Sequence, residues 1–123
     1  MNLPPVFSLL QASGSVTNII GASPTRAYLF GTAPQNTPEP YLTWQLPVSV
    51  PENHLDRLPV VDNDRVQIDL WAQDPNDCIN LAGAVRDALE PHAHMITKLN
   101  MGMDADSNLH RWVLEFTFWT PRT

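Results

Sequence analysis

Apolar residues recur at two different spacings along this chain, and the two spacings separate helices from strands. Residues 3–12 repeat apolar side chains at helical spacing behind two prolines. A second short turn follows, with Ser15 as its cap and Gly21 at its end. Residues 75–90 carry the longest helical stripe, between an Asp-Pro start and a following proline. The sequence therefore predicts a short N-terminal helix and one long helix.

Alternation of apolar and polar side chains predicts the strands, which are residues 26–30, 41–50, 65–72, 93–103 and 109–119. Pro47 interrupts the second of these runs, so it predicts an edge strand, a bulge or an early end near Leu46. Residues 31–40 are rich in proline and residues 51–63 are polar. Both segments are predicted to be mobile loops.

The order of these elements is helix, strand, strand, strand, helix, strand, strand. It predicts an α+β fold with a single mainly antiparallel β-sheet of four to five strands and the long helix packed on one face. A length of 123 residues fits a single domain over 1–123. The opposite face of the sheet carries Trp71, Arg111, Val113, Glu115 and Trp119.

An uncovered sheet face with tryptophan and arginine has the composition of a protein–protein interface. The alternative for Trp71 is that the N-terminal helix of the same chain covers it. The net charge limits the kinds of partner to be expected. The chain has 13 acidic and 7 basic side chains, which gives a net charge of −6. This balance argues against a classical nucleic-acid binder, which usually carries a basic face.

Other compositional features set the expected compartment. A single cysteine excludes a disulfide within the chain and favours cytosolic folding. No apolar run approaches the ~18 residues that a membrane-spanning helix needs, so no membrane-spanning helix is expected. The N-terminus lacks the basic and apolar regions of a secretion signal.

Three histidines are candidates for a metal site. His92 and His94 share a strand face, and His110 lies on the next strand. A turn centred on residues 105–106 would pair His94 with a position near Thr117 and His110 with one near Met101. The three side chains are then not neighbours, so a zinc site of three histidines is not expected.

Other candidate chemistry is also weak. Asp104, Asp106 and Asn108 have the spacing of a calcium loop, but the required glycine position holds Leu109 and the flanks are strands. A hairpin turn is the prediction. Cys78 lies on the apolar stripe of the long helix and is predicted to be a buried structural cysteine. No phosphate loop or nucleophile elbow is present in the sequence, so we expect no enzyme and no cofactor.

Several strings occur along nearly the whole chain in a characteristic order: Pro-Pro-Val-Phe-Ser-Leu-Leu, the turn 16–21, a Pro-rich loop leading into Pro40-Tyr-Leu-Thr-Trp-Gln45, Asp64-Arg-Val-Gln-Ile-Asp-Leu-Trp-Ala72 and Asn80-Leu-Ala-Gly-Ala-Val-Arg-Asp-Ala-Leu89. In this layout the chain resembles the small tail completion, or tail terminator, proteins of long-tailed bacteriophages. Arg65-Val-Gln-Ile-Asp69 followed by an Ala-Val-Arg helix is the most specific part.

The resemblance implies a structural virion protein, assembled in the host cytoplasm and located at the head-proximal end of the tail. Such proteins form a homo-oligomeric ring, typically a hexamer, that caps the tail tube, stops its polymerisation and provides the surface for head–tail joining. The implied partners are the tail tube protein and a head–tail connector or stopper protein. DNA passes through the lumen without specific binding. Two alternatives stay open: another connector component, such as a stopper or neck ring, and a small cellular ligand-binding α+β module.

The residues expected to form subunit or partner contacts lie in the second polar loop and at aromatic or charged positions of the strands. They are Asn53, His54, Asp56, Arg57, Asp62, Asp64, Trp44, Trp71, Arg111 and Trp119. For each of them the alternative is a solvated loop residue or a core aromatic.

Overall fold

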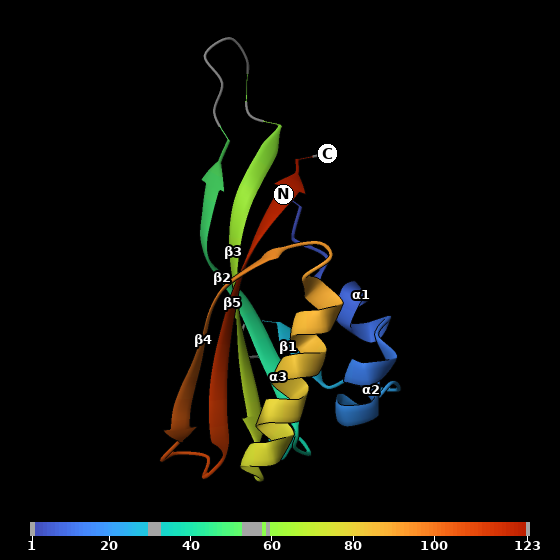
Figure 1. The fold of residues 1–123 in the computed structure, drawn as a ribbon, viewed down its shortest axis with the longest axis vertical. Coiled ribbons are helices and arrows are strands. Elements are labelled where there is room, and N and C mark those ends of the chain that lie inside the picture. Colours follow the sequence, from blue (N-terminus) through green and yellow to red (C-terminus); the bar gives the residue numbers. More distant parts are fainter. Residues whose placement is uncertain (1, 30–32, 53–57, 59, 123) are drawn as a thin grey trace.

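One twisted five-stranded sheet organises the molecule (Figure 1). The computed structural model describes residues 2–29, 33–52, 58 and 60–122. The strands are β1 (Ala27–Leu29), β2 (Tyr41–Pro51), β3 (Val61–Ala72), β4 (His94–Met103) and β5 (His110–Pro121), in the spatial order β1-β2-β3-β5-β4. All neighbours are antiparallel except β1 and β2, which are parallel. The predicted α+β class is confirmed.

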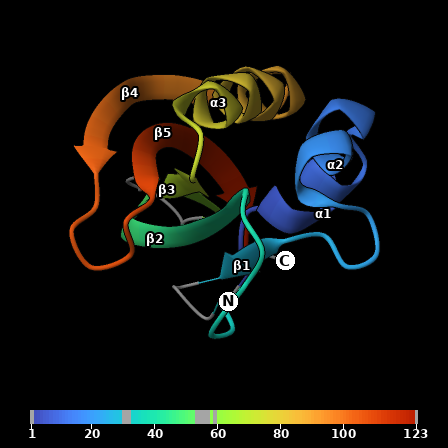
Figure 2. The same cartoon turned by 90° about the horizontal axis from the view of Figure 1, so that it is seen from below.

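Three helices lie on one face of this sheet (Figure 2): α1 (Val6–Gln11), α2 (Gly14–Ile20) and α3 (Pro75–Leu89). The long helix α3 packs on β3 and β5, and the two short helices pack beside it. The core between these layers includes Leu10, Ile20, Leu70, Leu81 and Phe116, which are all fully buried. The predicted single long helix on one sheet face is therefore confirmed.

Local signals set the ends of the helices. The side chain of Asp74 accepts a hydrogen bond of 2.9 Å from the Asn76 amide and caps α3, as predicted. The cap of α2 is Ser13 and not Ser15, because Ser13 has the extended backbone of a cap and accepts from the Val16 amide. Gly21 ends α2 with a φ of +89°, which favours glycine.

The hairpin of β2 and β3 is longer than the alternation of residues indicates. β2 continues to Pro51 and β3 begins at Val61, so the predicted loop 51–63 is wrong at both ends. Residues 61–64 read as a loop because three of them are polar, yet their backbone pairs with both β2 and β5. A register shift between Gln45 and Val48 confirms a bulge at Pro47.

We name residues 48–51 of β2 and 61–64 of β3 the arm, together with Glu52, Leu58 and Val60 of the connection between them. The arm extends beyond the layer of helices, beside the end of β5 (Figure 1). A hydrogen bond of 2.9 Å from the Glu52 amide to the Val61 carbonyl continues the ladder past the last strand residue. The arm is therefore ordered by backbone pairing and lies outside the main core.

The last two strands form the predicted hairpin. His94 pairs with Thr117, as predicted, but His110 pairs with Met103 and not with Met101, because β4 contains two register shifts. Both histidines thus lie at opposite ends of the β4–β5 ladder. The carboxylate of Asp104 accepts two 3.0 Å bonds from Ser107, which closes a hairpin turn as expected.

Candidate interaction surfaces

We name the sheet face turned away from the helices the outer face, and no helix of the described residues covers it. The even-numbered side chains of β3 from Asp64 to Ala72 are buried, while Arg65 is exposed and Gln67, Asp69 and Trp71 are half-buried on the outer face. Alternation along the strand explains this difference. The outer face therefore offers polar and aromatic groups to solvent, as the sequence predicts.

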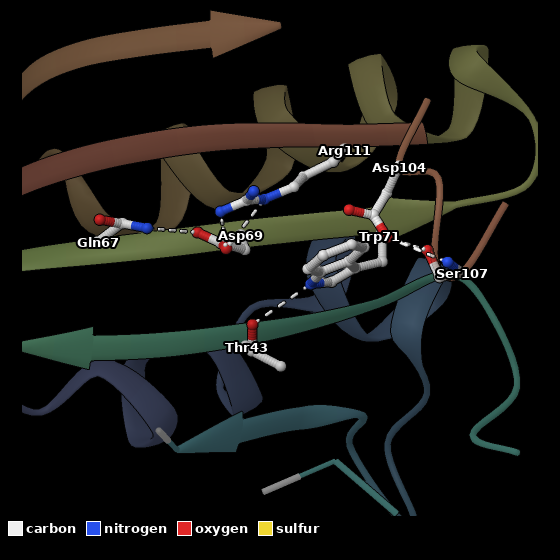
Figure 3. Close-up of polar contacts among 7 residues, drawn as sticks. All are labelled: Thr43, Gln67, Asp69, Trp71, Asp104, Ser107 and Arg111. Carbon is white, nitrogen blue, oxygen red and sulfur yellow. Dashed lines mark hydrogen bonds and ion pairs between the residues drawn. The ribbon is translucent and has the colours of Figure 1, made fainter. Parts of the chain in front are cut away.

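Two of the predicted contact residues, Trp71 and Arg111, meet in a cluster on this face (Figure 3). Arg111 donates from Nε and Nη2 to Oδ2 of Asp69 over 3.1 and 2.7 Å. Its guanidinium lies 5.3 Å from the centre of the Trp71 ring. Trp71 donates from its indole nitrogen to Thr43 over 3.3 Å, and Tyr41 stacks on it at 6.3 Å. We name these five residues the aromatic–arginine cluster.

The N-terminal helix does not cover Trp71, contrary to the alternative given for this residue. The N-terminal helix lies on the opposite face of the sheet (Figure 2), so it does not cover this tryptophan. Tyr41 and Arg111 on the neighbouring strands flank the ring. Trp71 therefore has its polar contacts satisfied within the chain and keeps part of its surface exposed.

An open hollow of about 390 Å³ lies beside the aromatic–arginine cluster, lined by Ala33, Tyr41, Thr43, Trp44, Gln45, Gln67, Asp69 and Trp71. Its one carboxylate is already used, because Asp69 accepts from Gln67 at one oxygen and from Arg111 at the other. The polar groups thus bind one another instead of converging on a ligand. The arrangement suits a packing surface better than a small-molecule site.

Trp119 lies at the opposite end of the outer face and is 48% exposed. Its indole nitrogen donates to Glu52 over 3.3 Å, and His94 meets its ring edge-on at 5.5 Å. Asn63 separates Trp119 from the exposed Val50 in the same row of the sheet. An exposed tryptophan and an exposed valine on the same face of a sheet are typical of a contact surface.

The acidic residues of the arm are held in different ways. Asp62 forms an ion pair of 3.0 Å with Arg122 at the end of β5. Asp64 is only 2% exposed and accepts a hydrogen bond from Ser49. Among the described residues, its second oxygen and the hydroxyl of Thr120 have no partner. Asp64 therefore belongs to the interior of the arm and does not present its carboxylate to solvent.

The remaining predicted contact residues divide into two sets. Trp44 is 5% exposed and packs in the core, so in the single chain it does not provide contact surface. Trp44 is therefore a core aromatic, which was the alternative to a contact residue. It lies two residues after Leu42 on the same strand, so both side chains point to the buried face of the sheet. Asn53, His54, Asp56 and Arg57 lie outside the described residues.

A second exposed region, at the β4 edge of the sheet, was missed by sequence reasoning. Its apolar side chains are between 45% and 57% exposed, and they are Ile79 of α3 with Ile96, Leu99, Met101 and Met103 of β4. We name these five residues the edge patch. The available signals were an isoleucine on the polar side of the long helix and apolar residues on both faces of one strand.

A groove of about 290 Å³ adjoins the edge patch between α3 and β4. It is lined by Ile79, Ala82, Gly83, Arg86, Met95, Lys98, Trp112 and Leu114. The two basic side chains stand beside an otherwise apolar lining. The groove is therefore a second candidate for partner contact.

Two observations on the described residues concern the candidate thiol and metal chemistry. Burial raises the pKa of the Cys78 thiol to about 11, with a smaller contribution from Asp77. Cys78 is fully buried, as predicted. Within the described part of the chain, no group of three or more His, Cys, Asp or Glu side chains is placed to hold a metal ion.

Comparison with known proteins assigns the chain to a family. The profile of the family described as tail completion protein gp17 matches residues 4–121. No match was found among curated proteins. No helix within the described ranges is both long and apolar enough to span a membrane. The family is a structural one of bacteriophage tails, which makes the protein a component of the virion. Since the match extends over nearly the whole sequence, this chain belongs to the tail completion protein gp17 family.

Proposed function

We propose that this protein is a tail terminator subunit. It forms a homo-oligomeric ring, a hexamer, that caps the head-proximal end of the tail tube. The ring stops polymerisation of the tube protein and presents the surface to which a head–tail connector or stopper protein binds. The family match over residues 4–121 carries this proposal, because it already assigns the chain to the completion of the tail.

The distribution of surface groups supports assembly over catalysis. The outer face carries an exposed tryptophan at one end and the aromatic–arginine cluster at the other. The edge patch adds exposed apolar side chains at a sheet edge. Exposed apolar groups gathered in patches mark protein contact sites.

Net charge supports the passage of DNA through such a ring. A chain with a charge of −6 repels the phosphate backbone instead of holding it. Repulsion of this kind favours a lumen that lets DNA move.

Growth of the tail tube tests the proposal. Purified tube protein is allowed to polymerise with and without this protein, and tube ends are examined by electron microscopy. The expected result is short tubes with extra ring density at one end only. Tubes of unchanged length without end density would contradict the proposal, and binding to a connector but not to the tube would favour the stopper alternative.

A further inference from the structure

Most of the large apolar side chains that are exposed in this protein fall into two groups. One group is the edge patch. The other, which we name the arm patch, consists of Val48, Val50, Leu58, Val60 and Trp119. Trp119 belongs to the end of β5 that pairs with the arm. Between 45% and 83% of each of these side chains in the arm patch is exposed.

The two patches are separate surfaces: most of the arm patch lies on or near β2 and β3, away from β4, and only Trp119 lies next to β4, where it meets His94. The sheet order β1-β2-β3-β5-β4 puts β4 at one edge, and the arm begins on the far side with β2. β1 pairs with β2 only at residues 42–44, so it leaves the β2 side of the arm uncovered. A contact between unlike patches joins subunits head to tail, and such contacts close into rings when the rotation fits.

The groove beside the edge patch has room for side chains from another molecule. Gly83 lines it in the middle of α3, and a Cβ added there would meet no described atom within 4 Å. Glycine within a helix lowers the stability of that helix relative to alanine. Close packing inside this chain does not require Gly83.

The outer edge of β4 is also unprotected. No described strand pairs with this edge, and Lys98 is the one charged side chain of β4 other than its histidine. Proteins usually protect an exposed edge strand with charges, prolines or a covering segment. Apolar residues at a bare edge indicate that a partner covers it.

Charge favours the arm as that partner. Among the described residues of the arm, Glu52 is the exposed carboxylate outside any ion pair, because Asp62 pairs with Arg122 and Asp64 is buried. Of the two basic groups that line the groove, Arg86 already pairs with Asp87 and Glu90, which leaves Lys98. Opposite charges at the rim of an apolar contact guide association and fix its orientation.

We propose that the arm patch of one copy packs on the edge patch and the adjoining groove of the next copy. This inference rests on the proposed ring, and it assigns the contact that builds the ring. Each subunit then gives its arm to one neighbour and accepts the arm of the other. An isolated copy leaves one patch of each kind unfilled.

Two variants separate the two halves of this contact. Gly83→Leu adds an apolar side chain to the groove at a position where a Cβ meets no described atom within 4 Å, and leucine favours the helix more than glycine does. Val50→Lys places a long cation on the exposed outer face of the arm, where it meets Arg86 and Lys98 of the neighbour. Matched controls are Asn80→Leu, one turn earlier on the exposed side of α3, and Asn18→Lys, an exposed position of α2 outside the named surfaces.

The experiment is native mass spectrometry of each variant, alone and mixed, with tube protein present where wild-type rings require it. Neither test variant is expected to form rings at ten times the concentration that suffices for wild type. An equal mixture of the two is expected to form a dimer with one copy of each, since one intact arm meets one intact groove. Both controls are expected to assemble as wild type does, and thermal unfolding checks that all variants fold.

Other outcomes overturn the proposal in different ways. Rings of both test variants at wild-type concentration would place the subunit contact elsewhere and leave the terminator function standing. Rings of Val50→Lys that no longer bind the tube would assign the arm to the tube protein. A wild-type chain that forms no ring, alone or with the tube, would overturn both this contact and the proposed function.

Discussion

At the scale of single residues, the outer face depends on one partly buried ion pair. The side chain of Asp69 is 13% exposed and that of Arg111 is 27% exposed, so removal of either partner leaves a charge with little water around it. Arg111 also packs on Trp71 through its guanidinium plane. Arg86 offers a contrast, since it and its partners Asp87 and Glu90 are well exposed.

Truncation of the two arginines tests this difference. Arg111→Ala is expected to lower the free energy of unfolding by about 1–3 kcal/mol, because Asp69 loses its charged partner in a poorly solvated place. Arg86→Ala is expected to lower it by at most about 0.5 kcal/mol, as is usual for exposed pairs. Urea unfolding at concentrations where the chain is monomeric measures both, and equal losses would contradict the assigned role of the Asp69 pair.

A second prediction concerns Cys78 and alkaline pH. Burial raises the pKa of this thiol from its ordinary value of 9.0 to about 11 in the folded chain. The unfolded thiol ionises first as pH rises, so stability that is fully present below pH 9 is lost between pH 9 and pH 11. The loss expected from this group is about 2–3 kcal/mol.

Urea unfolding of wild type and Cys78→Ala across this pH range measures the effect. Burial also raises the pKa of Tyr41, so the wild-type curve contains a second contribution of the same sign. The variant removes only the thiol, and its stability is expected to fall less steeply. Parallel curves for the two proteins would show that Cys78 does not ionise differently in the folded and unfolded chains.

At the scale of the elements, the end of α2 depends on the backbone of Gly21. Its φ of +89° is strained for other residues, and an added Cβ would lie 2.8 Å from the Pro24 carbonyl oxygen. Gly14 at the other end of the same helix has no neighbour within 4 Å of an added Cβ. The same substitution therefore has opposite consequences at the two ends.

Gly21→Ala is expected to lower the free energy of unfolding by about 1–3 kcal/mol, because the clash and the positive φ both resist a side chain. Gly14→Ala is expected to leave stability unchanged or to raise it by up to about 1 kcal/mol. Thermal and urea unfolding of both variants measure this contrast. A Gly21→Ala protein as stable as Gly14→Ala would refute the role given to the left-handed residue.

The elements with strong local signals were predictable from the sequence. α3 has an Asp-Pro start, a continuous apolar stripe and a following proline, and each of these acts within a few residues. The start of β3 was not predictable, because Asp62, Asn63 and Asp64 resemble a loop. Their order comes from backbone pairing with two neighbouring strands, which side-chain polarity does not report.

At the scale of the whole molecule, register decides which predicted residues meet. Trp71 and Arg111 were predicted as contact residues, and pairing of β3 with β5 places them directly opposite each other. Tyr41 completes the aromatic–arginine cluster from β2, but its alignment with Trp71 follows from the β2–β3 pairing, which periodicity alone does not fix. The edge patch was missed for a similar reason, since exposure of β4 depends on its place at the end of the sheet.

At the same scale, the fold leaves two apolar surfaces exposed. Phe116, Leu70 and Leu81 are buried between the sheet and its helices, while the arm patch and the edge patch stay exposed in a single copy. In the proposed ring, one repeated contact between copies covers both patches.

The mass of the native protein, measured by mass spectrometry alone and with its tail tube protein, tests the central claim most directly. The account predicts a closed ring of six copies, formed either in isolation or only on the end of a tube. A protein that stays monomeric and does not bind the tube would contradict it, because it would form no ring and cap no tube end.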